Sequence, residues 1–352
     1  MRDVAIVSFA QSPSVRREIY RNEVEMLMPV VHDAIARSGI GRKEIGFTCS
    51  GSCDYLAGAP FAFVQGLDAV GAWPPIKESH VEMDGAWAMY EAWARMQHDD
   101  IDSALIYGFG KSSLGPLPDV MVLQLDPYYV APLWPDSISI AALQARAFLE
   151  KGHSESELAE VVARSRANAR SNPNAQLAGE VTVEQLLSEP YLTSPLRKHD
   201  CPPISDGVSA VVLAAGDLAR KVCERPAWIR GLEHRIEPHG LGVRDLSRSV
   251  STEAAGRAAG VADGAVDVAE LHAPFSFQEL MVAEALGLNA AKTDINPSGG
   301  ALAANVVMAA GLSRIGEAAS RIMDGRAGRA VAHATSGPAL QHNLVCVLEG
   351  DR

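Results

Sequence analysis

Short β-type runs alternate with helical stretches along this chain. Runs rich in Val, Ile, Leu and Ala that are too short for helices suit strands buried on both faces, whereas apolar residues spaced three or four apart indicate amphipathic helices. In the first half the pattern predicts strands at 4–9, 44–49, 103–107 and 208–214, and helices at 22–38 and 84–98. In the second half it predicts strands at 227–232, 266–271, 329–333 and 344–348, and helices at 251–259, 277–286 and 301–323.

The two halves repeat one order of strands and helices, and the first half carries an extra segment. Prolines are frequent within residues 111–200, and a helix there begins at Ser154, where Glu157 three residues later gives capping-box spacing. We therefore expect an N-terminal half at 1–218, with a helical, loop-rich subdomain inserted at about 111–200, and a C-terminal half at 219–352. Such a duplication predicts a layered α/β fold whose site lies where loops of both halves meet.

Composition is that of a soluble globular protein. The 352 residues are 47% hydrophobic and carry 31 Lys plus Arg against 43 Asp plus Glu, a formal net charge of −12. Without a basic run we expect no nucleic-acid partner, and no apolar run approaches the ~20 residues of a membrane span. Five cysteines and no signal-peptide pattern favour a cytoplasmic protein. Cys49 and Cys53 lack companion ligands, so no metal site is expected.

Four segments resemble thiolases in their order and spacing. Residues 201–214 (CPPISDGVSAVVLA) are similar to the thiolase strand CPxSDGAxAxVLA, and residues 266–288 contain ELHAPFS where sterol-carrier-protein thiolases read ELHDCFS. Residues 295–311 resemble the loop in which NPSGG precedes Gly-His-Pro, and residues 336–350 contain the ALQHN of the sterol-carrier type. The chain is identified as a member of the thiolase superfamily, similar to the lipid-transfer-protein type that includes steroid side-chain aldolases.

The resemblance implies a fold, a substrate class and partners. The implied fold is the thiolase fold, a duplicated αβαβα arrangement of five layers, and the implied assembly is a dimer or a dimer of dimers. The substrate is an acyl-CoA, with no cofactor beyond the CoA that the substrate carries. Aldolases of this type act with a small OB-fold, zinc-ribbon protein, so such a partner, or a thiolase-like paralogue, is expected.

The thiolase nucleophile has no counterpart here. Thiolases use a cysteine at the N-terminus of a buried helix, where the helix dipole favours the thiolate. Residues 82–84 at that helix are Glu-Met-Asp, and Pro274 and Ala339 stand where the family carries other cysteines. Claisen chemistry through an acyl-enzyme is therefore not expected.

Two polar residues suit a reaction without a covalent step. His272 stands where thiolases have an asparagine that polarises the thioester oxygen, and Asn305 stands where they have the Gly-His-Pro histidine, so the pair is swapped. Two preorganised donors stabilise a thioester enolate, and losing one costs ~3–4 kcal/mol of barrier. This pattern suits retro-aldol cleavage of a β-hydroxyacyl-CoA. The base that removes the β-hydroxyl proton stays open among His342, Asp84 and Glu82, with an imidazole favoured near neutral pH.

These candidates also have structural interpretations. His272 suits a hydrogen-bonded core histidine, Asn305 a turn or N-cap, His342 a loop cap, and Asp84 the N-cap of its helix.

Ser298, Gly299 and Gly300 are expected to form a tight turn that brings the backbone close to the substrate.

Three functions are compatible with this sequence. The first is an acyl-CoA carbon–carbon lyase acting on a steroid or sterol side chain, or a subunit of one. The second is a catalytically silent thiolase-like subunit that supports an active paralogue, its pocket filled by Met83, Met308 or Trp87. The third is an acyl-CoA acyltransferase with Ser298 or Ser336 as nucleophile.

Overall fold

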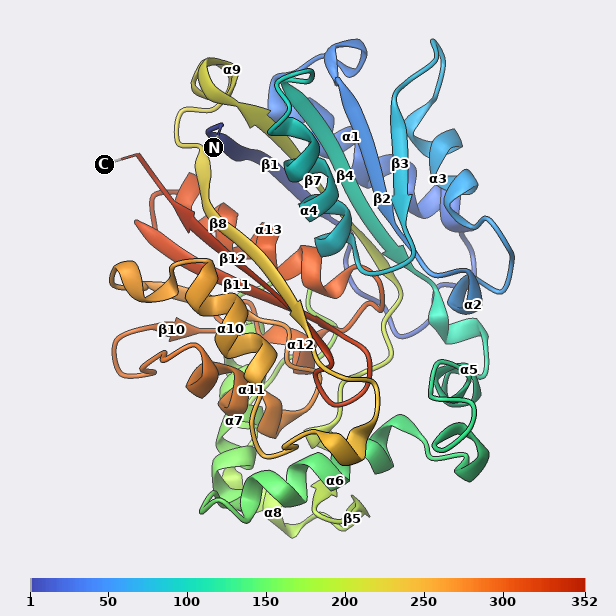
Figure 1. Ribbon diagram of the computed structural model, residues 1–352, viewed down its shortest axis with the longest axis vertical. Coiled ribbons are helices and arrows are strands. Elements are labelled where there is room, and N and C mark those ends of the chain that lie inside the picture. The colour runs from blue at the N-terminus through green and yellow to red at the C-terminus, as the bar shows by residue number, and fades with distance from the viewer. Residues whose placement is uncertain (1, 352) are drawn as a thin grey trace.

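The computed structural model describes residues 2–351, and its main strands join in one mixed sheet (Figure 1). The strand order is β10-β9-β11-β12-β8-β1-β7-β4-β2-β3, and a separate hairpin holds β5 and β6. The strands are β1 (Val4–Gln11), β2 (Phe47–Gly51), β3 (Glu78–Val81), β4 (Ser103–Gly110), β5 (Tyr191–Thr193), β6 (Leu196–Arg197), β7 (Gly207–Ala215), β8 (Ala227–Ile236), β9 (Val268–Leu271), β10 (Asp294–Ile295), β11 (Arg329–Ser336) and β12 (His342–Glu349).

The strand order confirms the predicted duplication. From the centre outward, the N-terminal half has the order β1-β7-β4-β2-β3 and the C-terminal half has the order β8-β12-β11-β9-β10. In both halves the first two pairings are antiparallel and the next two are parallel. The halves meet where β1 and β8 pair, with Ala5 opposite Trp228 and Ile6 opposite Ala227.

Helices complete the five layers. They are α1 (Glu23–Ser38), α2 (Asp54–Ala57), α3 (Phe63–Val70), α4 (Gly85–Met96), α5 (Leu117–Leu123), α6 (Ser137–Leu149), α7 (Glu155–Ala169), α8 (Val183–Ser188), α9 (Gly216–Val222), α10 (Val250–Ala258), α11 (Ser276–Ala285), α12 (Gly300–Ala303) and α13 (Ala310–Met323). Helices α1 and α3 pack on one half-sheet, α10 and α11 pack on the other, and α4 and α13 lie between them.

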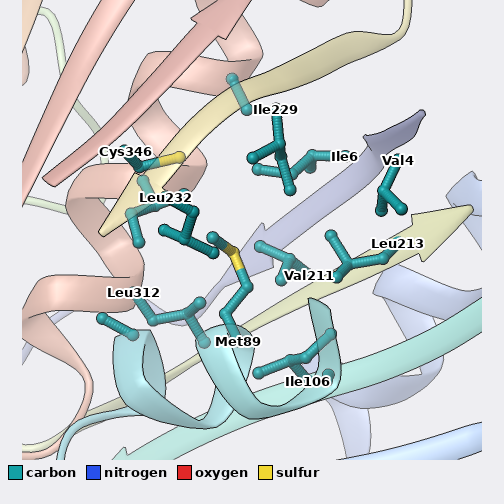
Figure 2. Close-up of a cluster of buried hydrophobic side chains, with 14 of the residues drawn as sticks. Val4, Ile6, Met89, Ile106, Val211, Leu213, Ile229, Leu232, Leu312 and Cys346 are labelled. Carbon is teal, nitrogen blue, oxygen red and sulfur yellow. The ribbon is translucent and has the colours of Figure 1, made fainter. Parts of the chain in front are cut away.

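The central layer contains the largest apolar cluster. Met89 of α4 and Leu312 of α13 pack among Ile106 of the N-terminal half and Leu232 and Cys346 of the C-terminal half (Figure 2). Helix α13 is buried along most of its length, and its buried residues include arginines and a glutamate. Because a buried charge is costly unless it is paired, these side chains must find partners inside the molecule.

Side-chain caps begin several of the helices. Asn22, the first residue of the helix predicted at 22–38, is the N-cap of α1, which ends at Gly39 with φ of 68°. Ser154 and Glu157 form the predicted capping box of α7. Such caps satisfy amide groups that a helix end leaves without partners, which makes them readable from a few neighbouring residues.

The single helix predicted over 301–323 is wrong, because the chain forms α12 and α13 with an irregular segment between them. In this segment the carbonyl oxygen of Met308 accepts from Gly85 N at 2.9 Å instead of from a helical amide. Glycines on β4 allow the close approach: a Cβ at Gly108 would lie 2.5 Å from the Met308 oxygen, and one at Gly110 would lie 2.1 Å from the Val307 oxygen. A helix-favouring composition is thus overridden by tertiary packing.

The segment between β4 and β7 contains α5 to α8 and the β5–β6 hairpin. Figure 1 shows α6 and α8 beyond the end of the sheet. The domain boundaries at 111–200 and 218 stay predictions. Strand β2 begins later than expected, and β3 and β10 were not predicted because both are short. Within residues 2–351 no helix has the length and apolarity needed to cross a membrane.

Candidate functional site

His272 lies at the carboxyl end of β9 and is buried. Its backbone N–H donates to the carbonyl oxygen of His333 at 3.1 Å, which continues the strand pairing by one residue. Its ring Nδ1 accepts from Thr335 N at 3.4 Å, so the ring proton is placed on Nε2. Nε2 then donates to Asn305 Oδ1 at 3.1 Å.

The imidazole of His272 is held neutral at physiological pH. Burial lowers its pKa to about 4, the contact with Asn305 acts in the opposite direction, and the charge of Arg314 lowers it further. A neutral imidazole of fixed tautomer can hold a partner amide in one orientation.

Asn305 lies in the irregular segment between α12 and α13, and its backbone N–H donates to Ser205 Oγ at 3.1 Å. Its Oδ1 is occupied by His272. Among the contacts within residues 2–351, its Nδ2 donates to no partner. The structure therefore brings the two predicted residues together. His272 donates to Asn305, and the Asn305 Nδ2 group is the donor that stays available to a ligand.

His342 begins β12 and is half-buried. Its ring meets Trp87 of α4 edge to face, with centroids 6.4 Å apart. Thr335 Oγ1 donates to the carbonyl oxygen of His342 at 2.9 Å, so Thr335 contacts both His272 and His342. Burial lowers the pKa of His342, which favours the neutral form that can accept a proton. Thr335 was missed by sequence reasoning because a threonine inside a strand carries no local signal.

Asp84 is the N-cap of α4, as predicted, and it also holds the start of α13. Its Oδ1 accepts from Ala86 N at 2.9 Å and Leu312 N at 3.0 Å, and its Oδ2 accepts from Gly311 N at 2.9 Å. Burial raises the pKa of Asp84, and the three amide donors act in the opposite direction. Because both oxygens face backbone amides of two helix starts, a role for Asp84 as general base stays a prediction.

Glu82, the third candidate base, is exposed, and its Oε1 accepts from Asp54 N at 2.5 Å. Cys53 lies beside this segment, since β2 and β3 are parallel with Gly51 opposite Val81. Burial raises the pKa of the Cys53 thiol, and the charge of Glu82 raises it too. A thiolate is therefore disfavoured at this position.

The turn at 296–300 packs against α7. Gly299 has φ of 96° and Gly300 has φ of 65°, and a Cβ on Gly299 would lie 2.8 Å from Ala169 Cβ. Both positions thus require glycine for backbone conformation and space. The predicted substrate-binding role of this turn stays a prediction.

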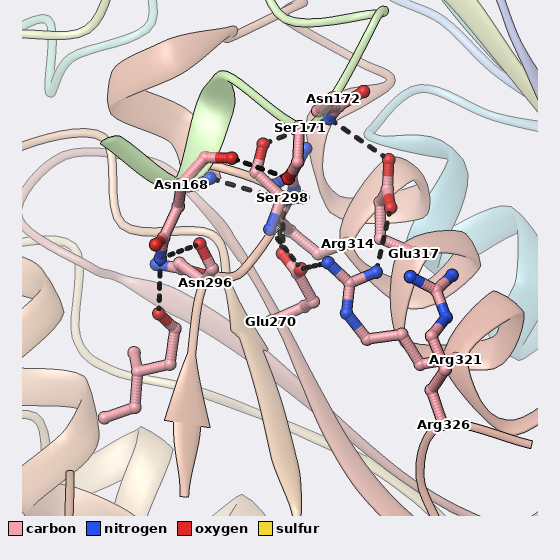
Figure 3. A network of polar contacts seen from close by, with 12 residues as sticks. Asn168, Ser171, Asn172, Glu270, Asn296, Ser298, Arg314, Glu317, Arg321 and Arg326 are labelled. Carbon is pink, nitrogen blue, oxygen red and sulfur yellow. Dashed lines mark hydrogen bonds and ion pairs between the residues drawn. The ribbon is translucent and has the colours of Figure 1, made fainter. Parts of the chain in front are cut away.

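Ser298 in this turn belongs to a buried ionic network (Figure 3). Its N and Oγ donate to Glu270 Oε1 and Oε2 at 3.0 and 2.6 Å. Glu270 is fully buried and pairs with Arg314 at 3.1 Å and Arg321 at 3.7 Å. Burial raises the pKa of Glu270, and the arginine charges lower it.

The network joins the elements that carry the candidate pair. Glu270 lies two residues before His272 on β9, and Arg314 lies on α13, the helix that follows the Asn305 segment. Sequence reasoning missed this network. The signal was present as a glutamate in the apolar run VDVAEL and an arginine in a helix of small residues.

No group of three or more His, Cys, Asp or Glu side chains in the described part of the chain is arranged to hold a metal ion.

Comparisons with known proteins agree with the thiolase assignment, although no family model matches the chain. A 155-residue segment is 35% identical to an acetyl-CoA acetyltransferase of Methanothermobacter thermautotrophicus and covers 42% of this chain and 40% of that one. A 201-residue segment is 29% identical to sterol carrier protein 2 of Oryctolagus cuniculus and covers 49% and 36%. These alignments thus span well under half of either curated relative.

Solved structures match the whole fold. The chain superimposes on an Ltp2-ChsH2(DUF35) aldolase with a TM-score of 0.82 and 17% identity over 99% of this chain and 98% of that one. It superimposes on human mitochondrial 3-ketoacyl-CoA thiolase with a TM-score of 0.76 and 17% identity over 100% and 99%. The fold and the duplicated sheet are those of a thiolase-like protein. By sequence the chain is similar to thiolase-superfamily proteins, among them the sterol-carrier type.

Proposed function

We propose that this protein is an acyl-CoA carbon–carbon lyase, or a subunit of one, that cleaves a β-hydroxyacyl-CoA by a retro-aldol reaction. The buried contact between His272 Nε2 and Asn305 Oδ1 carries the proposal. It fixes the Asn305 amide so that Nδ2 is the hydrogen-bond donor left for a thioester oxygen. A donor held in advance stabilises an enolate without reorganisation during the reaction.

The reaction needs a base but no nucleophile. The base removes the β-hydroxyl proton, the Cα–Cβ bond breaks, and its electron pair passes into the thioester as an enolate. The enolate then takes a proton at Cα to give the shortened acyl-CoA, and the other product is a ketone or aldehyde. No atom of the protein is bonded to the substrate, so the chain requires no cysteine at 82–84.

His342 is the base we favour. Asp84 is occupied by three backbone amides, and the protonated state of His272 is disfavoured by burial. His342 is half-buried, with a lowered pKa that keeps it unprotonated near neutral pH. Its contact with Thr335, which also touches His272, supports its placement near the candidate pair.

The substrate class and the partner are part of the proposal. Similarity to sterol carrier protein 2 and to the fold of the Ltp2-ChsH2(DUF35) aldolase supports a steroid or sterol side chain as the acyl group. The same neighbour, a complex with a DUF35 protein, supports an OB-fold, zinc-ribbon partner for this chain. We further propose that the protein is cytoplasmic and dimeric.

Two alternatives have specific support. A silent subunit is favoured by Trp87, a buried side chain that contacts His342 at the start of α4. An acyltransferase is favoured by the 2.6 Å contact of Ser298 Oγ with Glu270, a carboxylate that could accept its proton. The pairing of Glu270 with Arg314 opposes that role because it stabilises the ionised carboxylate as an ion-pair partner.

The test uses the full chain, purified alone and with its co-expressed genomic neighbours, on β-hydroxyacyl-CoA steroids with mass-spectrometric detection. A ketone or aldehyde with a shortened acyl-CoA, lost in His272→Ala and Asn305→Ala but kept in the exposed control His98→Ala, supports the lyase. An acyl mass gain on the protein that disappears in Ser298→Ala supports the acyltransferase instead. The silent-subunit alternative is supported if no partner gives cleavage and if a paralogue loses its activity when this chain is withheld.

A further inference from the structure

A cavity opens beside the end of β1, where the two half-sheets have separated beyond Ile6. Its volume is about 520 Å³, within the range of small-molecule sites. The side chains that matter below are Gln11, Arg37, Asn172, Glu317, Arg321 and Arg326. We call it the seam cavity, and neither His272 nor Asn305 lines it.

The lining of the seam cavity is rich in cationic donors. Arg37, Arg321 and Arg326 contribute three guanidinium groups, and Glu317 contributes the one carboxylate. Figure 3 shows Arg321 and Arg326 reaching toward the side of Glu317, with Asn172 beyond it. In a chain of net charge −12, a cavity with this lining is a local positive region that concentrates anions.

The single carboxylate is already occupied. Glu317 Oε1 accepts from Gln11 Nε2 at 2.6 Å and from Asn172 Nδ2 at 3.3 Å, and its Oε2 pairs with Arg321 at 3.5 Å. These contacts hold Glu317 and Arg321 in place at the inner wall. They leave the charges of Arg37 and Arg326 at the rim.

Within residues 2–351, the two rim arginines form ion pairs only with exposed aspartates. Arg37 pairs with Asp33 and Arg326 pairs with Asp324, and neither aspartate lines the cavity. Their side chains are 61% and 59% exposed. Exposed ion pairs are worth about 0–1 kcal/mol, so an anion that meets both guanidinium groups can displace the aspartates.

We propose that the seam cavity binds a small phosphate-bearing polyanion, held at the rim by Arg37 and Arg326. Guanidinium groups bind phosphate through paired, charge-assisted hydrogen bonds, which favours a phosphate over a monovalent ion. The phosphate comes either from a free inorganic anion or from a nucleotide. This inference does not depend on the lyase reaction.

The test titrates pyrophosphate into the full chain and measures heat of binding and the unfolding temperature, with KCl added to keep ionic strength constant. The dissociation constant should rise about a hundredfold in Arg37→Gln/Arg326→Gln, since two charged donors are lost and each is worth about a factor of ten. It should change less than about twofold in Arg248→Gln, a matched exposed arginine paired with Glu253 outside the cavity.

Competition identifies the source of the phosphate. Displacement of pyrophosphate by adenosine 3′,5′-bisphosphate at equal or lower concentration indicates a nucleotide ligand, and lack of displacement indicates a free anion. The proposal is overturned if pyrophosphate does not stabilise the protein beyond matched KCl, or if the double variant, folded by circular dichroism, binds as tightly as the wild type.

Discussion

Two buried polar centres lie near the segment between α12 and α13: Asp84, at the start of α13, and the pair His272 and Asn305. They differ in how many of their hydrogen-bonding groups have partners. At Asp84, three backbone amides from two helix starts occupy both carboxylate oxygens. At His272 and Asn305, the ring is fixed on both nitrogens, yet the asparagine keeps an amide donor without a partner among the described residues. A completed set of hydrogen bonds is typical of a structural centre, and spare capacity at a buried group is typical of a functional one.

Asp84→Ala should give the largest effect on stability. Three amides lose their acceptor, each at about 1–3 kcal/mol, so the free energy of unfolding should fall by roughly 3–9 kcal/mol in urea denaturation. The control is Asp217→Ala, a fully exposed acid in the first turn of α9, where a loss below about 1 kcal/mol is expected. If both variants lost the same free energy of unfolding, Asp84 would have no greater structural role than an exposed acid.

Asn305→Ala tests the other centre. Loss of one oxyanion donor should lower kcat/KM for the cleaved acyl-CoA about 10²–10³-fold, measured with the partner present. Exposed Asn289→Ala is the control and should keep full activity. If Asn305→Ala keeps its kcat/KM, Asn305 does not contact the reacting oxygen and the contrast between the two centres fails.

The dependence of the free energy of unfolding on pH shows whether His272 is neutral or charged in the folded protein. Its pKa is about 4 in the folded protein, whereas a histidine in an unfolded chain has a pKa of about 6.5. The unfolded chain therefore binds more protons, so stability is complete above about pH 6.5 and falls as the pH decreases toward 4.

His272→Gln should reduce this acid-dependent loss by up to about 3 kcal/mol, read from urea midpoints at a series of pH values. His333, whose pKa burial lowers to about 3, continues the loss at lower pH in both proteins. Parallel pH curves for the variant and the wild type would mean that His272 is charged or solvated in the folded state.

Thr335→Val should give the smallest effect. The substitution removes the Oγ1 donor to the His342 carbonyl oxygen and keeps the backbone N–H that fixes His272. We expect a loss of about 0.5–1.5 kcal/mol in thermal unfolding and less than about a threefold fall in kcat/KM. A tenfold or greater fall in activity would show that the Thr335 hydroxyl, rather than its backbone, positions the site.

Local sequence patterns predicted the elements that depend on near neighbours. The caps at Ser154 and Asp84 follow from a few adjacent residues, and the buried strands follow from short apolar runs. The break between α12 and α13 could not be predicted, because it depends on glycines of β4 about 200 positions away. The edge strands β3 and β10 were not predicted, because they are too short to show a periodic pattern.

The candidate site shows the same division. His272 and Asn305 became candidates because they occupy positions at which thiolases carry other polar residues. The structure contains a hydrogen bond between them, although they are 33 positions apart in the chain. The bond between Thr335 and His272 and the ion pair between Glu270 and Arg314 depend on register and helix placement. Neither leaves a pattern that a single sequence reveals.

The sequence by itself determined the duplicated α/β architecture, the resemblance to thiolases and the absence of a cysteine at 82–84, since periodicity, motif order and residue identity are local properties. Only the tertiary structure decided that Asp84 accepts hydrogen bonds from the first turns of two helices, α4 and α13. The same holds for the neutral state of His272, for its hydrogen bond to Asn305, and for the three arginines that line one cavity. Hydrogen-bond partners, burial and electrostatic fields arise from residues far apart in the chain, and these interactions set the chemistry of a buried group.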